Sequence, residues 1–331
     1  MQRGQGMLTL LHTKVYFAYK YSSSVEIGKK IWVNGKFVDT ENATIHVLTH
    51  ALHYATGVFE GIRCHDTGNS AAIFRLHEHV KRLLSSAKIY MMDLQYGFDD
   101  ICNAIIETVK VNGMKDCYIR PIAYYSYGKM GVNPLPNKVD LAIAVWRWDE
   151  YLSKQGQGIR CMVSSWRRID ARTMPVNAKA TANYANSALA RVEALKNGFD
   201  EAIMLNINGM VAEASAENVF IVSDGLLCTP PTTDGALAGI TRDTVLQLAR
   251  HEGIKYEIRS ISRDELYTAD EVFLTGTASG IKPVISIDNR KVGDGYVGII
   301  TKRLQMLYEN AILGKDERFA KWLTYVDINQ K

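Results

Sequence analysis

The sequence predicts a mixed α/β protein of two domains, on three observations. Its 331 residues are about twice the ~150 residues of a typical domain. Strand-like segments alternate with segments of helical spacing, but hairpin turns interrupt them, which argues against a simple doubly wound parallel sheet. A polar stretch, SKQGQG, reads as a linker. We therefore expect an N-terminal extension (1–30), a small α/β domain (31–152), an interdomain linker (153–158) and a large domain (159–331).

The small domain is expected to combine a hairpin, two helices and buried strands. Asn34-Gly35 lies between two apolar segments and is typical of a type I′ turn, so 31–38 predicts a hairpin. Apolar residues recur at helical spacing over two further segments, the second of which stops at Gly113. The expected helices are 77–89 and 99–112, and the expected strands are 73–76, 117–125 and 139–146.

The large domain is expected to mix strands, hairpins and helices. Asn208-Gly209 and Asp224-Gly225 are the predicted hairpin turns. The helix predicted after the first strand carries an apolar face of Ala185, Leu189, Val192 and Leu195. The expected strands are 159–164, 201–207, 218–223 and 271–274, and the expected helices are 184–197 and 241–252.

Composition and charge exclude several classes of protein. Hydrophobic residues make up 47% and charged residues 22% of the chain, which is a globular composition. The net charge of +4 is too small to indicate a nucleic-acid or anionic-membrane partner, and no apolar run approaches the ~18 residues of a membrane span. The five cysteines form no CxxC pair, so we expect free thiols in a reducing, cytoplasmic compartment. The basic segment 1–30 reads as an appendage or a start placed before Met7, rather than as a transit peptide.

No common metal or nucleotide motif stands in a suitable context. His77 and His79 are two residues apart, so on a helix they face different sides, and His46 and His50 share a face only if their segment is helical. We therefore expect no metal site. The GxSxG, P-loop and GxGxxG patterns are also missing from this sequence in the required context.

The strongest chemical candidate is Lys179. Small residues surround it, and the chain has no acid between Asp170 and Glu193, which favours the neutral, nucleophilic amine. Glu213 and Glu217 stand among small apolar residues further on. Two glycine-led turns, 239–243 and 276–280, offer free backbone amides for an anion. An amine nucleophile, a buried carboxylate and a phosphate-sized anion site together fit pyridoxal 5′-phosphate.

Eight motifs follow one another along the chain: HALHYATGVFEGIRCHD (50–66), YIRP (118–121), GVNP (131–134), VSSW (163–166), AKATANY (178–184), EASAEN (213–218), GITRD (239–243) and GTAS (276–279). In this order they resemble those of the branched-chain amino acid aminotransferases, which are class IV, fold-type IV enzymes dependent on pyridoxal phosphate. The resemblance runs from about residue 31 to 326 and implies a small α/β domain joined to a larger pseudo-barrel domain.

The resemblance implies a set of cofactor contacts. Lys179 is expected to form the Schiff base with the cofactor and to shuttle a proton during the reaction. Glu213 is expected against the pyridine nitrogen, which it keeps protonated so that the ring acts as an electron sink. Glu217 is expected to pack and hydrogen-bond around the site. The remaining cofactor-binding residues implied are Arg82, Tyr184, Ile240, Thr241 and Thr277.

The resemblance also implies a pocket that accepts both branched-chain L-amino acids (leucine, isoleucine, valine) and glutamate, in a ping-pong exchange with 2-oxoglutarate. The amides of Thr277 and Ala278, with Tyr118 nearby, are expected to bind the α-carboxylate. Arg120, with the hydroxyls of Tyr54 and Tyr151, is expected to meet the distal carboxylate of glutamate. The apolar wall is expected to contain Tyr54, Phe59, Trp148, Tyr151 and Tyr184.

The resemblance implies a homodimer at least, with a hexamer as the larger assembly, because Val132 lies in a loop that the other subunit contributes. D-amino-acid aminotransferases and aminodeoxychorismate lyases share this scaffold and remain alternatives, as does a non-catalytic cofactor-binding protein. One departure from the pattern is Gly280, where many relatives have an acid, and we expect it to loosen that loop.

Overall fold

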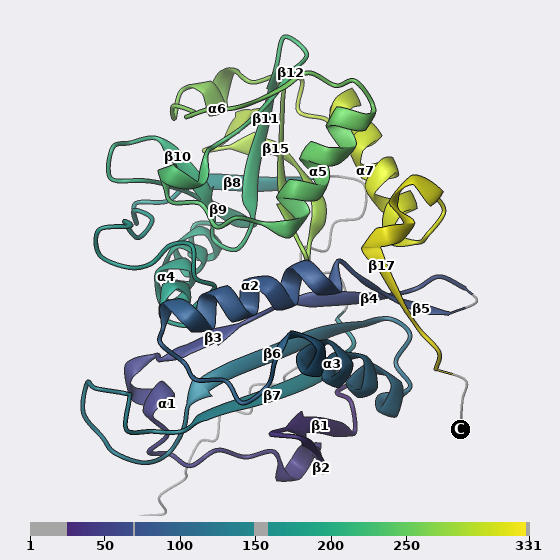
Figure 1. The fold of residues 1–331 in the computed structure, drawn as a ribbon. Coiled ribbons are helices and arrows are strands. Elements are labelled where there is room, and N and C mark those ends of the chain that lie inside the picture. The colour runs from purple at the N-terminus through teal and green to yellow at the C-terminus, as the bar shows by residue number, and fades with distance from the viewer. Residues whose placement is uncertain (1–24, 69, 149–157, 329–331) are drawn as a thin grey trace, which may run out of the picture.

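The computed structural model describes residues 25–68, 70–148 and 158–328, and it is built on two β-sheets that stand one above the other (Figure 1). The first sheet carries helices α2 and α3, and the second carries α4 to α7. We call each sheet together with its helices a body. Helix α2 lies on the side of the first body that faces the second (Figure 1). This confirms the predicted mixed α/β class with hairpins.

The first sheet is antiparallel in every pairing, in the order β17-β5-β4-β6-β7-β1-β2, with β3 paired to β6. The predicted hairpin at Asn34-Gly35 is confirmed, as are the strands at 117–125 and 139–146. The strands are β1 (Lys30–Val33), β2 (Lys36–Asp39), β3 (Gly57–Phe59), β4 (Ile62–Asp66), β5 (Ala71–Phe74), β6 (Cys117–Tyr125), β7 (Val139–Trp146) and β17 (Leu323–Val326).

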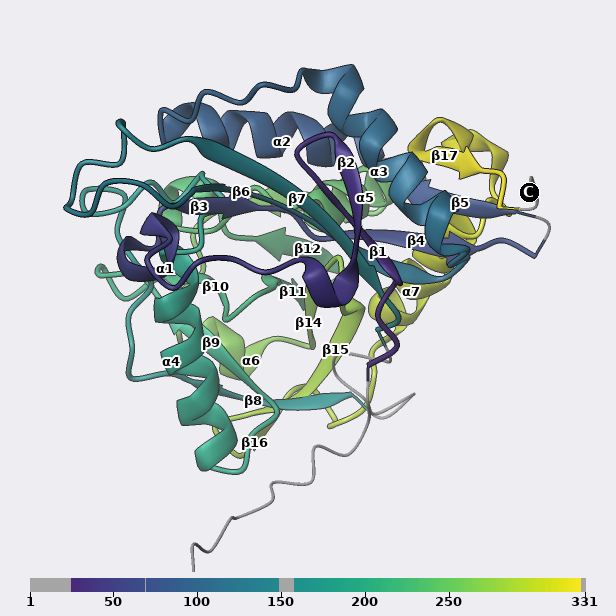
Figure 2. The ribbon, with the colours of Figure 1, turned by 90° about the horizontal axis from the view of Figure 1, so that it is seen from below.

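Three helices accompany this sheet: α1 (His50–Tyr54), α2 (Leu76–Ile89) and α3 (Phe98–Asn112). Both predicted helices are confirmed as α2 and α3, and each buries its apolar face against the sheet core around Ile105 and Ile119. Helix α1 lies beside the loop between β6 and β7 (Figure 2), where His50 Nε2 donates to the Gly131 carbonyl at 2.7 Å. Because both nitrogens of His50 have hydrogen-bond partners, the histidine is a structural group.

The second sheet has the order β10-β9-β8-β15-β14-β11-β12-β13, with β16 paired to β15. It curls back on itself, because Ala214 N of β10 donates to the Glu217 carbonyl just before β11 at 2.7 Å. Its strands are β8 (Ile159–Val163), β9 (Glu201–Leu205), β10 (Val211–Ala214), β11 (Asn218–Ser223), β12 (Leu226–Thr229), β13 (Tyr256–Ile258), β14 (Glu271–Gly276), β15 (Gly280–Ile287) and β16 (Arg290–Lys291).

The helices of the second body are α4 (Asn183–Lys196), α5 (Ile240–His251), α6 (Glu265–Thr268) and α7 (Ile299–Ile312), and three 3₁₀ turns lie at Thr40–Asn42, Thr232–Asp234 and Glu317–Trp322. The apolar face predicted for α4 is wrong. Leu189, Val192 and Leu195 are about half exposed, whereas Ala190 and Ala194 are buried. The helix packs closely against β9, so the small side chains face the sheet and the large ones face outward.

The two bodies are linked at several places. Strand β17, near the end of the chain, pairs with β5 in the first sheet, although the preceding α7 belongs to the second body. Residues 27 and 28 pair with β7, so the described part of the predicted extension lies against the first sheet. The division at 31–152 and 159–331 stays a prediction. Among the described helices, none is long and apolar enough to cross a bilayer.

Candidate active site

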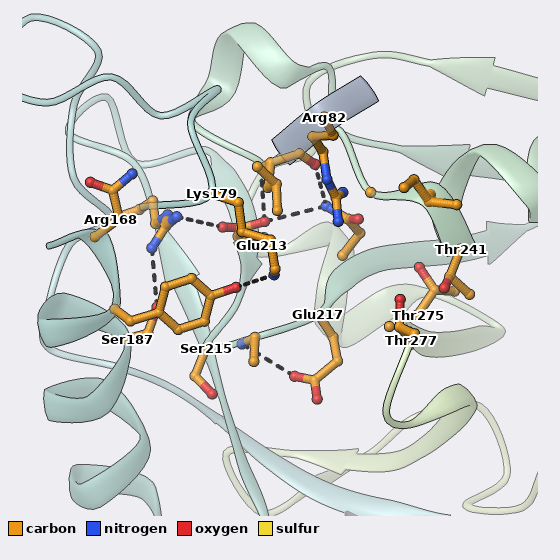
Figure 3. A pocket seen from close by; sticks show the side chains of 18 of the residues that line it. Arg82, Arg168, Lys179, Ser187, Glu213, Ser215, Glu217, Thr241, Thr275 and Thr277 are labelled. Atoms are coloured by element: carbon orange, nitrogen blue, oxygen red, sulfur yellow. Dashed lines mark hydrogen bonds and ion pairs between the residues drawn. The ribbon is translucent and has the colours of Figure 1, made fainter. Parts of the chain in front are cut away.

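A pocket lies where the two bodies meet. Its walls come from α2 of the first body and from β10, α4, α5 and the turn after β14 of the second. Figure 3 shows Arg168 on one side, Thr241, Thr275 and Thr277 on the other, and Lys179 between them. The pocket therefore brings together residues that are far apart in the sequence. The predicted cofactor residues that line it are Arg82, Lys179, Tyr184, Glu213, Ile240, Thr241 and Thr277.

Lys179 lies at the centre of the pocket on an irregular segment held to the first body. Its backbone amide donates to Ser86 Oγ of α2 at 3.0 Å, and its carbonyl accepts from Phe59 N at 3.0 Å. Its Nζ donates to the Tyr184 hydroxyl at 2.5 Å. Burial, together with the positive charge of Arg82, lowers the pKa of Lys179 to about 8. The amine is therefore available as a nucleophile close to neutral pH.

Tyr184 lies in the first turn of α4 and points its hydroxyl at Lys179. Its ring packs edge-on against Phe59, with 4.8 Å between ring centres. Burial, and then the charge of Glu213, raises the pKa of Tyr184 above its usual value. The hydroxyl therefore keeps its proton and acts as a hydrogen-bonding group.

Arg82 is fixed by a fully buried carboxylate, Glu60. The guanidinium Nε and Nη2 donate to the two oxygens of Glu60 at 2.6 and 2.9 Å, and Nη1 donates to the Ala238 carbonyl at 2.9 Å. His79 Nδ1 lies 2.7 Å from the same carboxylate. Burial would raise the pKa of Glu60, but Arg82 and His79 outweigh it and hold that pKa well below its usual range. The ionised carboxylate can only accept, so His79 Nδ1 carries the proton.

The first turn of α5 supplies backbone amides to the same part of the pocket. Gly239 precedes the helix, and no side chain caps it, so the amides of Ile240 and Thr241 lack intrahelical partners. Across from them, the buried Thr275 Oγ1 has no hydrogen-bond partner in the described chain. A guanidinium, free helix amides and an unpartnered hydroxyl are donors suited to a phosphate group.

Glu213 lies on β10 at another part of the pocket and is paired with Arg168. Arg168 Nη2 is 2.8 Å from Glu213 Oε1, and both side chains are less than one-tenth exposed. The second oxygen of Glu213 accepts from Leu237 N at 2.9 Å and from Asn218 Nδ2 at 3.3 Å. The carboxylate is thus held in place by donors on three other segments, at the position where the resemblance places the partner of the ring nitrogen.

A second cavity of about 520 Å³ adjoins the pocket and shares Lys179 and Tyr184 with it. The Arg120 guanidinium lies over the Phe59, Tyr118 and Trp146 rings, 4.7, 5.5 and 5.4 Å from the ring centres. Its Nε is buried without a hydrogen-bond partner among the described residues. The cavity thus combines aromatic walls with an available cation. Of the predicted substrate residues, those that line it are Phe59, Tyr118, Arg120, Trp148, Thr277 and Ala278.

Two predicted substrate residues that the structure describes, Tyr54 and Val132, do not line this cavity. Tyr54 lies on α1 and is 39% exposed, with its ring packed 4.6 Å from His50. Val132 lies in the loop between β6 and β7 and is 83% exposed. Tyr151 falls outside the described residues. Tyr54 and Val132 therefore occupy the outer surface of one chain.

Glu217 borders both cavities and is buried. One of its oxygens accepts from Ala216 N at 3.3 Å. Burial, and then the charge of nearby Glu201, raises the pKa of Glu217 well above its usual value, although Arg191 opposes this shift. Ser279 follows Ala278, and its buried hydroxyl has no partner in the described chain.

The prediction from sequence missed Glu60 and Arg168, the partners of Arg82 and Glu213. Glu60 stands inside the motif 50–66, and an acid between Phe59 and Gly61 in a buried strand region is itself a signal of a required partner. Arg168 comes just after VSSW and carries no such local signal, because only the fold brings it to β10. No group of three metal-ligating side chains is present in the described ranges.

Comparisons with known proteins match this geometry. Residues 57–287 match the amino-transferase class IV family. The branched-chain-amino-acid aminotransferase of Salmonella typhimurium is 44% identical over 300 residues, which covers 90% of this chain and 97% of that protein. Two solved branched-chain amino acid aminotransferases superpose with a TM-score of 0.87 each. That of T.th., complexed with N-(5′-phosphopyridoxyl)-L-glutamate, is 45% identical and is matched over 91% of this chain and 99% of its own. That of Thermoproteus uzoniensis, with norvaline, is 46% identical and is matched over 91% and 100%.

The chain therefore belongs to the class IV aminotransferases and, within them, to the group of the branched-chain-amino-acid aminotransferases. Enzymes of this family use pyridoxal 5′-phosphate, so the protein is a transaminase dependent on that cofactor. The relatives named above favour this group over the D-amino-acid aminotransferases and the aminodeoxychorismate lyases.

Proposed function

We propose that the protein transfers the amino group of leucine, isoleucine or valine to 2-oxoglutarate, giving the branched-chain 2-oxo acid and L-glutamate. The observation that carries this proposal is the cavity beside Lys179. Its aromatic walls suit a branched apolar side chain, and the unpartnered Nε of Arg120 suits the distal carboxylate of glutamate. A buried carboxylate without a partner would cost several kcal/mol, so a pocket that accepts both substrates needs such a cation.

The residues of the first pocket fit pyridoxal phosphate by their chemistry. Arg82, the Ile240 and Thr241 amides, Thr277 and the unpartnered Thr275 hydroxyl would hold its phosphate, and Glu213 would face its ring nitrogen. Tyr184 would hydrogen-bond the phenolic oxygen. When bound, the cofactor supplies an electron-withdrawing ring that makes the Cα proton of the substrate acidic.

The chain's own residues then divide the work in this proposal. Lys179 Nζ would take the proton from the substrate Cα and deliver it to C4′ of the cofactor. Its lowered pKa lets the amine act as a base near neutral pH. Tyr184, 2.5 Å away, orients that nitrogen. The Thr277 and Ala278 amides, with Tyr118, hold the α-carboxylate, while Phe59 and Trp148 exclude water from the side-chain cavity.

A two-substrate panel tests the substrate class. Purified holoenzyme would be assayed with 2-oxoglutarate against L-leucine, L-isoleucine, L-valine and D-alanine, and separately with aminodeoxychorismate. We expect glutamate to form with the three branched-chain L-amino acids. Turnover of D-alanine alone, or release of pyruvate from aminodeoxychorismate alone, would reject the proposal.

The proposed functional unit is a homodimer in the cytoplasm, with a hexamer as a larger possibility. The supporting observation is that Val132 and Tyr54 lie on an exposed surface of α1 and the β6–β7 loop, away from their own chain's cavity. The five cysteines are all buried and free, as is usual in a reducing compartment. Val132→Asp should lower both the mass in sedimentation analysis and the turnover, whereas Leu195→Asp on α4 should lower neither. A monomeric wild-type protein with full activity would contradict the dimer.

A further inference from the structure

Helix α2 and helix α5 belong to different bodies, yet both supply the proposed phosphate cup. Arg82 comes from the middle of α2, and the Ile240 and Thr241 amides come from the start of α5. Hydrogen bonds from both sides reach one phosphate only when the two helices keep a fixed spacing. A residue that joins the helices directly therefore controls the cup without lining it.

Arg75 makes such a connection. It lies immediately before α2 and is 6% exposed. Its Nη2 is 2.8 Å from Asp243 Oδ2, and its Nη1 donates to Thr244 Oγ1 at 3.1 Å. Asp243 and Thr244 both lie in the first two turns of α5, two and three residues after Thr241. The contact thus reaches the end of α5 that forms the cup.

The guanidinium of Arg75 is held on its other sides as well. Its Nε donates to Glu78 Oε1 at 2.6 Å, and its plane lies over the Trp322 ring, 5.1 Å from the ring centre. Its backbone N donates to the Trp322 carbonyl at 2.6 Å. The side chain is thereby locked between both bodies and the 3₁₀ turn near the end of the chain.

The backbone of Arg75 also shows that this arrangement is imposed by its surroundings. Its φ of 54° and ψ of 38° are left-handed, a conformation that costs a non-glycine residue about 1–2 kcal/mol. Such a conformation persists where neighbouring contacts determine it. Here the side chain is held by α5, Glu78 and Trp322, and the backbone N is held by the Trp322 carbonyl.

We propose that Arg75 is a positioning residue for cofactor binding, which sets the spacing of Arg82 and the α5 amides through its ion pair with Asp243. This inference rests on the phosphate cup assigned under the proposed function. Arg75 does not border the pocket, so it acts through α2 and α5 and not through contact with the ligand. Loss of Arg75 should therefore weaken binding of the cofactor's phosphate group more than binding of its ring.

The test compares pyridoxal 5′-phosphate with pyridoxal, which lacks the phosphate. Holoenzyme of each variant would be stripped, and binding of each compound would be titrated by absorbance. Arg75→Gln is expected to raise the Kd for pyridoxal phosphate about 10-fold, as for other outer partners of ligand-binding groups, and to leave the Kd for pyridoxal nearly unchanged. Turnover at saturating cofactor should stay close to that of the wild type.

Two further variants keep the test decisive. Asp243→Asn breaks the same ion pair and retains the stacking of Arg75 on Trp322, so it answers the question if Arg75→Gln does not fold. Arg303→Gln is the matched control, because Arg303 bridges α7 to Glu252 at the opposite end of α5, 2.8 Å away. Arg303→Gln should leave both Kd values unchanged.

Arg82→Gln separates the inference from the assignment beneath it. If Arg82→Gln does not weaken pyridoxal phosphate selectively, the proposed phosphate cup is wrong. If Arg82→Gln does so but Arg75→Gln and Asp243→Asn weaken both compounds equally or neither, the positioning role of Arg75 is refuted.

Discussion

Two buried arginine–glutamate pairs border the cofactor pocket and serve it in opposite ways. In the first, Glu60 accepts from Arg82, His79 and the Gly61 amide with its two oxygens, and it is Arg82 that borders the pocket. In the second, Arg168 and Glu213 both line the pocket, and Arg168 also donates to the Gly235 carbonyl and to Ser187. The first pair thus presents only its cation to the pocket, whereas the second presents its carboxylate with the arginine beside it.

The two pairs show how a buried pocket can contain both a positive and a negative charge with only a small loss of folding free energy. An isolated buried charge is strongly unfavourable, but a charge whose partner is fully hydrogen-bonded within the fold can be presented to a ligand. A ligand with a phosphate and a protonated ring nitrogen then meets the cation with one group and the anion with the other.

The largest effect is expected for the group between the two pairs. Lys179→Ala should reduce turnover on the order of 10,000-fold, because it removes both the nucleophile and the proton carrier. Steady-state transamination with L-leucine measures this loss. Lys302→Ala, an exposed position on α7, is the control and should keep full activity. Undiminished turnover of Lys179→Ala would remove Lys179 from the mechanism.

Glu213→Gln should come next, with a loss of about 100-fold in turnover at saturating cofactor, in the range seen when a stabilising group is removed from an active site. A neutral amide no longer favours a protonated ring nitrogen, and its NH₂ group meets the donors Leu237 N or Arg168. The kcat and the Kd of the cofactor should be measured together. A change in the Kd alone would assign Glu213 to binding, and the two pairs would then serve the same purpose.

Glu60→Gln should affect cofactor binding rather than turnover, in contrast to Glu213→Gln. Arg82 loses its ionised partner, so the Kd for pyridoxal phosphate should rise about 10-fold while kcat at saturating cofactor changes little. Thermal unfolding of the apoprotein should also occur at a lower temperature, because a buried pair is broken. Equal losses in kcat for Glu60→Gln and Glu213→Gln would abolish the contrast between the pairs.

The smallest predicted effect is a pH dependence of cofactor rebinding. Because the pKa of Lys179 is lowered to about 8, the fraction of neutral amine rises about threefold between pH 7.5 and 8.5. The rate at which apoprotein recombines with pyridoxal phosphate should rise by a similar factor and level off above pH 9. A rate that keeps rising toward pH 10.5 would show that Lys179 has an ordinary pKa.

Local patterns predicted helices α2 to α5 and the strands that include β6 and β7, but not α7, β15 or β17. The hairpin turns at Asn34-Gly35 and Asn208-Gly209 and the helix ends at Gly113 and Gly253 follow from residues adjacent in the chain. The face of α4 was predicted wrongly because helical spacing alone cannot tell which side meets the sheet. There Ala190 and Ala194 allow close packing, and Leu189 and Val192 remain outside.

The sequence correctly predicted that the neutral amine of Lys179 is favoured, but the reason given was incomplete. A stretch without acids indicated a weakened ammonium, but two buried carboxylates, Glu60 and Glu213, lie near the same pocket in the fold. The pKa of Lys179 falls chiefly because the amine is buried and then because Arg82 is close, and Glu60 opposes this shift. Burial and charges on other elements cannot be read from neighbours in the chain.

The sequence by itself determined the chemical groups of this protein. Lys179, Glu213 and the glycine-led turns stand in local patterns, because each needs a particular backbone or neighbourhood that adjacent residues provide. Only the tertiary structure decided the partners: Glu60 for Arg82, Arg168 for Glu213, and Arg75 for Asp243. These partners are 22, 45 and 168 residues apart. Folding brings each pair of charges within 3 Å, and it also removes them from water, except for the half-exposed Asp243.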